Sequence, residues 1–369
     1  MSGKSQIEQM HVFGILPNLV LREPFECEWV ALLPGSDERM QAIAKKDKTV
    51  HRLLNGFHDQ DGGKCEVTAL VVQKDAPAGV DFTALMSFRN LFAMSCVLKG
   101  WQSSLGQLNV FYPLYSDYFD FYPFRPVGDG VHIQHRGAAL NSWNSAKEFR
   151  AQRSADLPSF GHCLRADPDE VLCDYLVSAW KEQFIGGEGK WESLFRSLAV
   201  AYHAAGLPKK NLMWHYDFGV SIALWISAFE TLCHNGGSKD VGSSDLLELL
   251  ASTRFSKKAL RAGFEIKVKK EPRSVNAVQY LCWKLYGARN RFLHGNPFPE
   301  ESLFLETRNG SVGLNQAPPL VYKAALLNKF QHFLKSEEQE GEVAIVMSRL
   351  FEKRAFSEAI SFLVEGKRD

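Results

Sequence analysis

The stretch SVNAVQYLCWKLYGARNRFLHGNP, residues 274–297, carries a helical pattern that ends at a clear stop signal. With about 100° of rotation per residue, its apolar side chains gather on one face of a helix. These side chains belong to Val275, Val278, Leu281, Cys282, Leu285, Ala288 and Phe292. Gly295 and Pro297 follow the pattern, and both residue types are common just beyond the end of a helix. The stretch predicts one long amphipathic helix over residues 274–294, with this face in the core.

Further helices are predicted on both sides of this stretch. They are expected at about 168–185, 190–205, 213–234, 244–251, 256–262, 319–335 and 342–364. The first is expected to begin at Asp167, because aspartate is a good cap and Pro168 and Glu170 suit the first helical turn. Residues 165–369 are therefore expected to form an all-α helical bundle.

The first part of the chain has a mixed pattern. Apolar or alternating runs bounded by turn residues predict strands, and one run with helical spacing predicts a helix. The strands are expected at 25–33, 65–73, 107–114 and 131–136, and the helix at 81–98. Residues 1–155 should thus form an α+β domain, joined to the bundle by a polar linker near 151–164. The aromatic-rich segment 111–124 could stack on bases or a ligand; packing onto the sheet is the favoured interpretation.

Composition narrows the possible environments and partners. A length of 369 residues suggests two domains, and a net charge of +1 means that any nucleic-acid surface must be a local patch. The seven cysteines are scattered without a Cys-x-x-Cys pair, which predicts no zinc site and fits a reducing, cytoplasmic setting. No leader or membrane-spanning run is expected, and no cofactor or metal.

Three residues at the end of the predicted helix carry a motif. Arg289, Asn290 and His294, followed by Gly295, resemble the Arg-Asn-x-x-x-His signature of the HEPN superfamily. Residues 222–232, IALWISAFETL, are similar to the Ala-x-Glu-x-Leu helix of its Apea-like branch. The resemblance covers roughly residues 165–365.

Spacing alone does not single this motif out. Three other pairs also place a histidine shortly after an arginine: Arg52 and His58, Arg125 and His132, and Arg196 and His203. The adjacent Asn290, the end of a long helix and the following glycine distinguish Arg289 and His294. Arg196 and His203 are the strongest rival, because seven residues place both on one face of a helix.

The resemblance implies a metal-independent endoribonuclease of bacterial antiviral defence, toxin or abortive-infection type. In this interpretation His294 moves a proton near neutral pH and Arg289 binds phosphate, while Asn290 either orients His294 or donates a hydrogen bond to the phosphate. The resemblance also implies a homodimer through the helical domain, with the N-terminal domain sensing a trigger or binding an antitoxin-like partner. The alternatives are a non-catalytic HEPN scaffold that binds nucleotide, RNA or protein, and an antitoxin-like partner in a two-component system.

Two further residues are expected to support the motif. Glu230 lies among apolar neighbours, so its carboxylate should be paired, with Arg289 or Arg291 the nearest choice. Tyr286 and Trp283 fall on the helical face of Asn290 and His294 and should line or rim a cleft between two subunits, or else pack under the N-terminal domain. Arg289 lies about 140° around an ideal helix from His294, so a second subunit could be needed to bring them together.

A basic run precedes the motif helix. Lys267, Lys269 and Lys270 dominate it and, with Arg291, are candidates for binding an RNA backbone. Charge runs are more often ordinary solvated surface, which is the alternative for this segment.

Overall fold

The computed structural model describes most of the chain. The described residues are 10–16, 19–57, 63–64, 66–105, 122–127, 130–134, 139–140, 167–207, 215–234, 236, 240–268, 270–297, 299–307, 310–336 and 354–365. The chain forms two compact units. The first contains residues up to 93 with 113–167 and 180–188, and the second contains 94–112, 168–179 and 189–369. Helices α4 (Phe82–Ser104) and α5 (Glu170–Phe184) contribute residues to both units.

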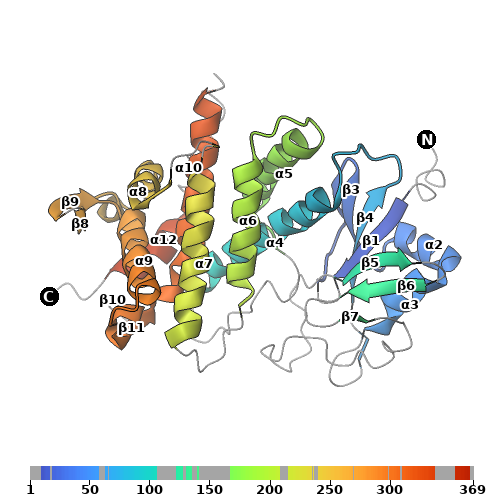
Figure 1. Ribbon diagram of the computed structural model, residues 1–369, viewed down its shortest axis with the longest axis horizontal. Coiled ribbons are helices and arrows are strands. Elements are labelled where there is room, and N and C mark those ends of the chain that lie inside the picture. The colour runs from blue at the N-terminus through green and yellow to red at the C-terminus, as the bar shows by residue number, and fades with distance from the viewer. Residues whose placement is uncertain are drawn as a thin grey trace. The chain divides into compact units, whose positions relative to one another are not determined.

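The first unit is built on an antiparallel sheet (Figure 1). Its four central strands follow the order β2 (Phe25–Cys27), β3 (Val30–Pro34), β4 (Thr68–Gln73) and β1 (Met10–Leu16). The sheet continues from β1 through β5 (Tyr122–Val127) to β6 (Gly130–Gln134) and β7 (Ala139–Leu140).

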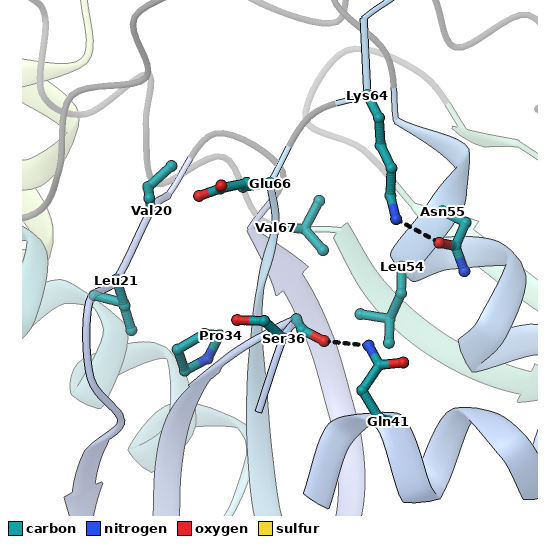
Figure 2. Close-up of a pocket in the computed structure, with 11 residues that line it drawn as sticks. Val20, Leu21, Pro34, Ser36, Gln41, Leu54, Asn55, Lys64, Glu66 and Val67 are labelled. Carbon is teal, nitrogen blue, oxygen red and sulfur yellow. Dashed lines mark hydrogen bonds between the residues drawn. The ribbon is translucent and has the colours of Figure 1, made fainter. Parts of the chain in front are cut away.

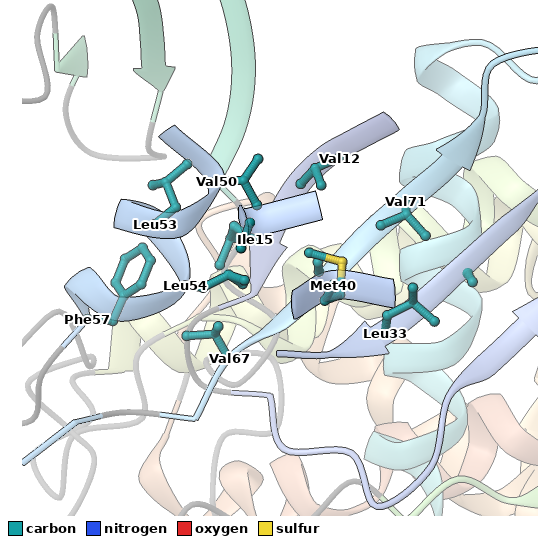
Figure 3. Packing of buried hydrophobic residues seen from close by; sticks show 13 residues of the cluster. Val12, Ile15, Leu33, Met40, Val50, Leu53, Leu54, Phe57, Val67 and Val71 are labelled. Atoms are coloured by element: carbon teal, nitrogen blue, oxygen red, sulfur yellow. The ribbon is translucent and has the colours of Figure 1, made fainter. Parts of the chain in front are cut away.

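One face of this sheet is covered by α2 (Glu38–Lys46) and α3 (Lys48–Gly56). Each helix begins at an aspartate: Asp37 accepts a hydrogen bond from the Arg39 amide at 2.8 Å, and Asp47 accepts one from the Thr49 amide at 2.7 Å. The apolar sides of both helices meet alternate residues of the strands and form one core cluster (Figure 3). Its members include Val12, Ile15, Leu33, Met40, Val50, Leu53, Leu54, Phe57, Val67 and Val71. Removing these side chains from water is the main stabilisation of the unit.

Aromatic side chains link β2 to α4 in the same unit. The ring of Phe25 lies 5.3 Å from that of Phe88 and 4.6 Å from that of Phe92. Trp180 also packs on Phe88, and its indole donates a hydrogen bond of 2.8 Å to the Ala84 carbonyl.

The expected α+β character of this part is confirmed, although β1, α2 and α3 were not predicted from the sequence. Residues 25–33 form two strands rather than one, because the chain reverses at Glu28, which has a positive φ of 45°. The strand expected at 65–73 is β4, the one at 131–136 is β6, and the helix expected at 81–98 is α4. The strand expected at 107–114, the linker at 151–164 and most of the aromatic segment lie outside the described residues.

The second unit is mostly helical, as expected. Beyond α5 it contains α6 (Glu192–Ala205), α7 (His215–Cys233), α8 (Ser243–Ala251), α9 (Ala277–Leu293), α10 (Pro318–Ser336) and α12 (Arg354–Val364). It also contains two hairpins, β8 (Phe264–Val268) with β9 (Glu271–Val275), and β10 (Phe304–Thr307) with β11 (Gly310–Gly313). The helical character of this half is confirmed, and the two short hairpins are additions that the sequence patterns did not predict.

Two local predictions in this unit are corrected by capping. The motif helix begins at Ala277 instead of residue 274, because Asn276 and Gln279 form a reciprocal capping box with bonds of 2.9 and 3.0 Å. The first helix is capped by Asp169 rather than Asp167, through a 3.3 Å bond from the Leu172 amide. The helix expected at 256–262 is only a 3-10 turn, Lys258–Leu260.

The core of this unit lies among α6, α7 and α10. Trp225, Phe229 and Tyr322 are buried and pack ring to ring. Ser197 hydrogen-bonds the Tyr322 hydroxyl at 2.7 Å and donates to the Ala228 carbonyl at 2.6 Å, so the hydroxyl groups of Ser197 and Tyr322 are both satisfied.

A buried charge ties three segments of the second unit together. Lys323 of α10 lies 2.5 Å from the Asp169 carboxylate and donates a 2.6 Å hydrogen bond to Gln102 near the end of α4. Lys323 is 2% and Asp169 5% exposed.

Among the described helices of the chain, none is long and apolar enough to span a membrane.

Candidate functional site

The motif residues occupy the last turns of α9, whose end has a defined geometry. His294 is the last residue at the helix end, and Gly295 adopts a positive φ of 65°. The Gly295 amide donates to the Phe292 carbonyl at 3.5 Å, and the Asn296 amide donates to the Arg291 carbonyl at 3.1 Å. This pair of bonds is the Schellman arrangement, which favours glycine at the left-handed position. The local sequence thus fixes where His294 leaves the helix.

Arg289 is held in place by three neighbours. One terminal nitrogen lies 3.8 Å from the Glu230 carboxylate on α7, and the other donates a 3.0 Å hydrogen bond to the Asn290 side chain. The guanidinium carbon lies 5.6 Å from the centre of the Tyr286 ring. The expected ion pair of Glu230 is therefore formed with Arg289.

Tyr286 completes this group. Its hydroxyl donates a short hydrogen bond to the other oxygen of Glu230. Burial, together with the Glu230 carboxylate, raises the pKa of Tyr286 well above its usual range. The phenol consequently remains protonated and continues to orient the carboxylate that pairs with Arg289.

His294 stands apart from this group. Its side chain is exposed, and no hydrogen bond or ion pair joins it to any described residue. Arg289, in contrast, is about three-quarters buried, with 24% of its side chain exposed. The structure thus brings together Arg289, Asn290, Tyr286 and Glu230, and leaves His294 accessible at the helix end.

Apolar side chains are exposed close to the motif, which sequence reasoning did not identify. Leu293 is 51% exposed and Val220, on α7, is 42% exposed. The two helices approach closely here, because a Cβ atom on Gly219 would lie 2.2 Å from the Phe292 ring. The signal available in the sequence was Leu293 itself, an apolar residue off the core face of the helix.

Trp283 does not belong to this site. It packs with Tyr280 against the small cluster of Leu247, Ile266 and Val275 beneath the β8–β9 hairpin. The sequence patterns did not predict the hairpin against which Trp283 packs, and its expected place in a cleft between two subunits remains a prediction.

The rival pair lies on an ordinary solvated helix surface. Arg196 forms a 3.7 Å ion pair with Glu192 one turn earlier, and its side chain is 72% exposed. His203 is exposed and lies edge-on to the neighbouring Tyr202 ring. Nothing in this geometry resembles the held arginine of α9.

The basic candidates are exposed at the hairpin before α9. Lys267 and Lys270 are exposed, whereas Lys269 lies outside the described residues. Lys270 adopts a positive φ of 74°. This left-handed backbone conformation costs a residue with a Cβ atom roughly 1–2 kcal/mol. Arg291 is exposed near the other end of α9. Since α9 has 17 residues, about 25 Å separates its two ends.

Comparison with protein-family models, with curated proteins and with solved structures finds no match to this chain. Within the described residues, no three histidine, cysteine, aspartate or glutamate side chains gather closely enough to hold a metal ion.

Proposed function

We propose that the helical half of the chain is a metal-independent endoribonuclease of the HEPN superfamily, with Arg289, Asn290 and His294 as its catalytic residues. The observation that carries the proposal is the combination of a fixed arginine and an accessible histidine within two turns of one helix end. Preorganised cationic donors and an accessible acid–base group are what phosphodiester cleavage requires.

The proposed reaction needs no component beyond RNA and the protein. The ribose 2′-oxygen attacks the adjacent phosphorus, and the bond from phosphorus to the 5′-oxygen breaks. His294 moves a proton in this exchange, in which the 2′-hydroxyl loses one and the 5′-oxygen gains one. Arg289 stabilises the charge that develops on the phosphate oxygens, and Asn290 keeps its guanidinium in position. The products are a 2′,3′-cyclic phosphate and a 5′-hydroxyl.

The β8–β9 hairpin supports RNA as the substrate. Lys270 is kept at the hairpin tip in a conformation where glycine or asparagine would be less strained. Strained backbone conformations cluster at functional sites, which suggests that the Lys270 side chain has a use. Lys267, Lys269 and Lys270 at one end of α9 and Arg291 near the other would bind separate phosphates of the same RNA.

We also propose that the active form is a homodimer through the ends of α7 and α9. Exposed Val220 and Leu293 lie beside a motif whose arginine and histidine do not contact each other. A two-fold interface would bury both apolar side chains and place each motif opposite its copy. Light scattering should show a dimer that Leu293→Asn converts to an inactive monomer; an active monomeric wild type would contradict this.

The alternative function is a non-catalytic scaffold that binds nucleotide, RNA or protein. The ion pair of Arg289 with Glu230 supports this alternative, because an ion pair of this kind can have a structural role without any catalytic one. A defence or toxin role, with the N-terminal unit sensing a trigger or an antitoxin-like partner, rests on the resemblance to the superfamily.

Cleavage of total RNA in the presence of a chelator separates the two functions. Wild-type protein should cleave, whereas His294→Ala should lose at least about a hundredfold in rate, the range that acid–base groups contribute. His51→Ala, which removes an exposed histidine from the other unit, is the matched control and should cleave normally. An inactive wild type that still binds RNA would support the scaffold.

A further inference from the structure

A pocket of about 250 Å³ lies in the N-terminal unit, away from the proposed catalytic residues (Figure 2). Four parts of the chain form it: the segment after β1, the turn from β3 into α2, the end of α3, and the residues that lead into β4. All of its lining residues belong to the first unit.

The floor of the pocket is apolar. Leu21, Pro34, Leu54 and Val67 line it, and Leu54 and Val67 are each only 4% exposed. The backbone closes the floor tightly, because the Gly35 amide donates a 2.7 Å hydrogen bond to the Val67 carbonyl. An apolar group placed here would be removed from water on a surface that is already formed.

Two opposite charges flank this floor. Lys64 extends toward Asn55, to which it donates a 2.6 Å hydrogen bond, while the carboxylate of Glu66 points toward Val20 on the other side (Figure 2). Glu66 makes no hydrogen bond or ion pair with any described residue. A ligand could therefore meet a cation at one side and an anion at the other.

Further polar groups lie on the lysine side. Gln41 donates a 2.6 Å hydrogen bond to the Gly35 carbonyl, which leaves its second amide hydrogen available. The Lys64 ammonium likewise retains two of its three donors beyond the bond to Asn55. These donors suit a carboxylate.

We propose that this pocket binds a small zwitterion, an α-amino acid with an apolar side chain. Its carboxylate would lie near Lys64, its ammonium group near Glu66, and its side chain on the apolar floor. The pocket is smaller than the roughly 300–1,000 Å³ typical of sites for drug-sized ligands, which favours an amino acid over a nucleotide or peptide. The proposal is independent of the ribonuclease activity.

Charge complementarity distinguishes the zwitterion from simpler ligands. An anion would leave Glu66 unpaired and facing it, and a cation would be repelled by Lys64. Because both charges are exposed, their screened attraction is modest, and the affinity should be weak, in the millimolar to high-micromolar range.

Calorimetric titration of the full-length chain with each of the twenty protein amino acids tests the proposal. L-Leucine is the reference ligand, compared with 4-methylpentanoate, which lacks the amino group, and 3-methylbutylamine, which lacks the carboxylate. Leucine or another apolar amino acid should bind at least about tenfold more tightly than either analogue of its own side chain.

Variants assign the binding to this pocket. Lys64→Met and Glu66→Gln should each weaken binding about tenfold or more. The exposed residues Lys48 and Glu23 provide matched controls, and Lys48→Met and Glu23→Gln should bind as the wild type does. The proposal is overturned if no amino acid binds at about 10 mM, if a singly charged analogue binds equally well, or if the pocket variants retain full affinity.

Discussion

Arg289 shows how single residues prepare the site at the end of α9. Its distance of 3.8 Å from Glu230 is too long for a hydrogen bond, and both side chains are about a quarter exposed, at 24% and 23%. An ion pair of this kind adds little stability. Its effect is orientation, reinforced by Asn290 and the Tyr286 ring. The Arg289 Nε atom is buried without a hydrogen-bond partner among the described residues, which costs free energy of folding. A purely structural role for Arg289 does not explain this cost.

Tyr286 should act as a positioning residue with a measurable alkaline signature. Tyr286→Phe removes the hydrogen bond to Glu230 and should cost about 1 kcal/mol of unfolding free energy, with a smaller loss of kcat than His294→Ala. The raised pKa of Tyr286 means that its contribution to stability is full below about pH 10 and declines as the pH rises above that value.

Urea unfolding at pH 8 and pH 10.5 measures this effect. The wild type should lose more stability between the two values than Tyr286→Phe does, while the buried Tyr322 contributes equally to both proteins. Equal losses would show that the Tyr286 hydroxyl is not coupled to folding, and a kcat as low as that of His294→Ala would make it a direct participant.

Among the elements, the close approach of α7 and α9 positions the motif. Gly219→Ala should destabilise the protein by about 1–3 kcal/mol and lower activity, because the added Cβ would lie 2.2 Å from the Phe292 ring. Gly287→Ala in α9 is the matched control, since its Cβ meets open space. That change should stabilise by up to about 1 kcal/mol through helix propensity. Thermal unfolding and cleavage rates of both variants check the pair, and similar effects would refute a close α7–α9 approach.

The buried lysine of α10 should be the most sensitive charged residue of the second unit. Lys323→Met removes the cation 2.5 Å from Asp169 and should cost about 3–5 kcal/mol. In the double variant with Asp169→Asn, part of this loss should be recovered, because asparagine is uncharged and can still cap α5. Denaturant unfolding of the two variants decides the point; additive losses would mean that the two charges are not coupled.

Helices with long periodic patterns, such as α5, α6, α7 and α10, were predictable from the sequence to within a few residues. The β8–β9 hairpin was not, because its strands are only five residues long and Glu271–Val275 has mainly exposed side chains without an apolar alternation. Because β9 was not predicted, the predicted start of α9 at residue 274 lay too early in the chain. Asn276 and Gln279 nevertheless had the spacing of a capping box.

The candidate site was predictable where local chemistry decides the pairing. An acid among apolar residues needs a partner, which led to the pair of Glu230 and Arg289. The buried pair of Asp169 and Lys323 joins residues 154 positions apart, and nothing local in either segment indicates it. Pairs of that kind depend on tertiary packing, which single-sequence patterns do not specify.

At the scale of the whole molecule, the RNA path that we propose runs between the two ends of α9. The triple change Lys267→Glu, Lys269→Glu and Lys270→Glu should weaken RNA binding, with near-normal cleavage at saturating RNA. The salt dependence should fall by about one unit of slope for each phosphate that the protein no longer binds. Lys45→Glu, Lys48→Glu and Arg52→Glu, at exposed positions of the other unit, form the matched control. Binding measured across salt concentrations tests this, and an unchanged slope would make the hairpin ordinary surface.

The chemistry of the RNA ends tests the central claim most directly. RNA cleaved in the presence of a chelator should carry 2′,3′-cyclic phosphates and 5′-hydroxyls, and these ends should disappear with Arg289→Ala and with His294→Ala while both variants remain folded. Fragments with 5′-phosphates, or the same ends at undiminished yield from either variant, would contradict the assignment of Arg289 and His294 as the catalytic pair.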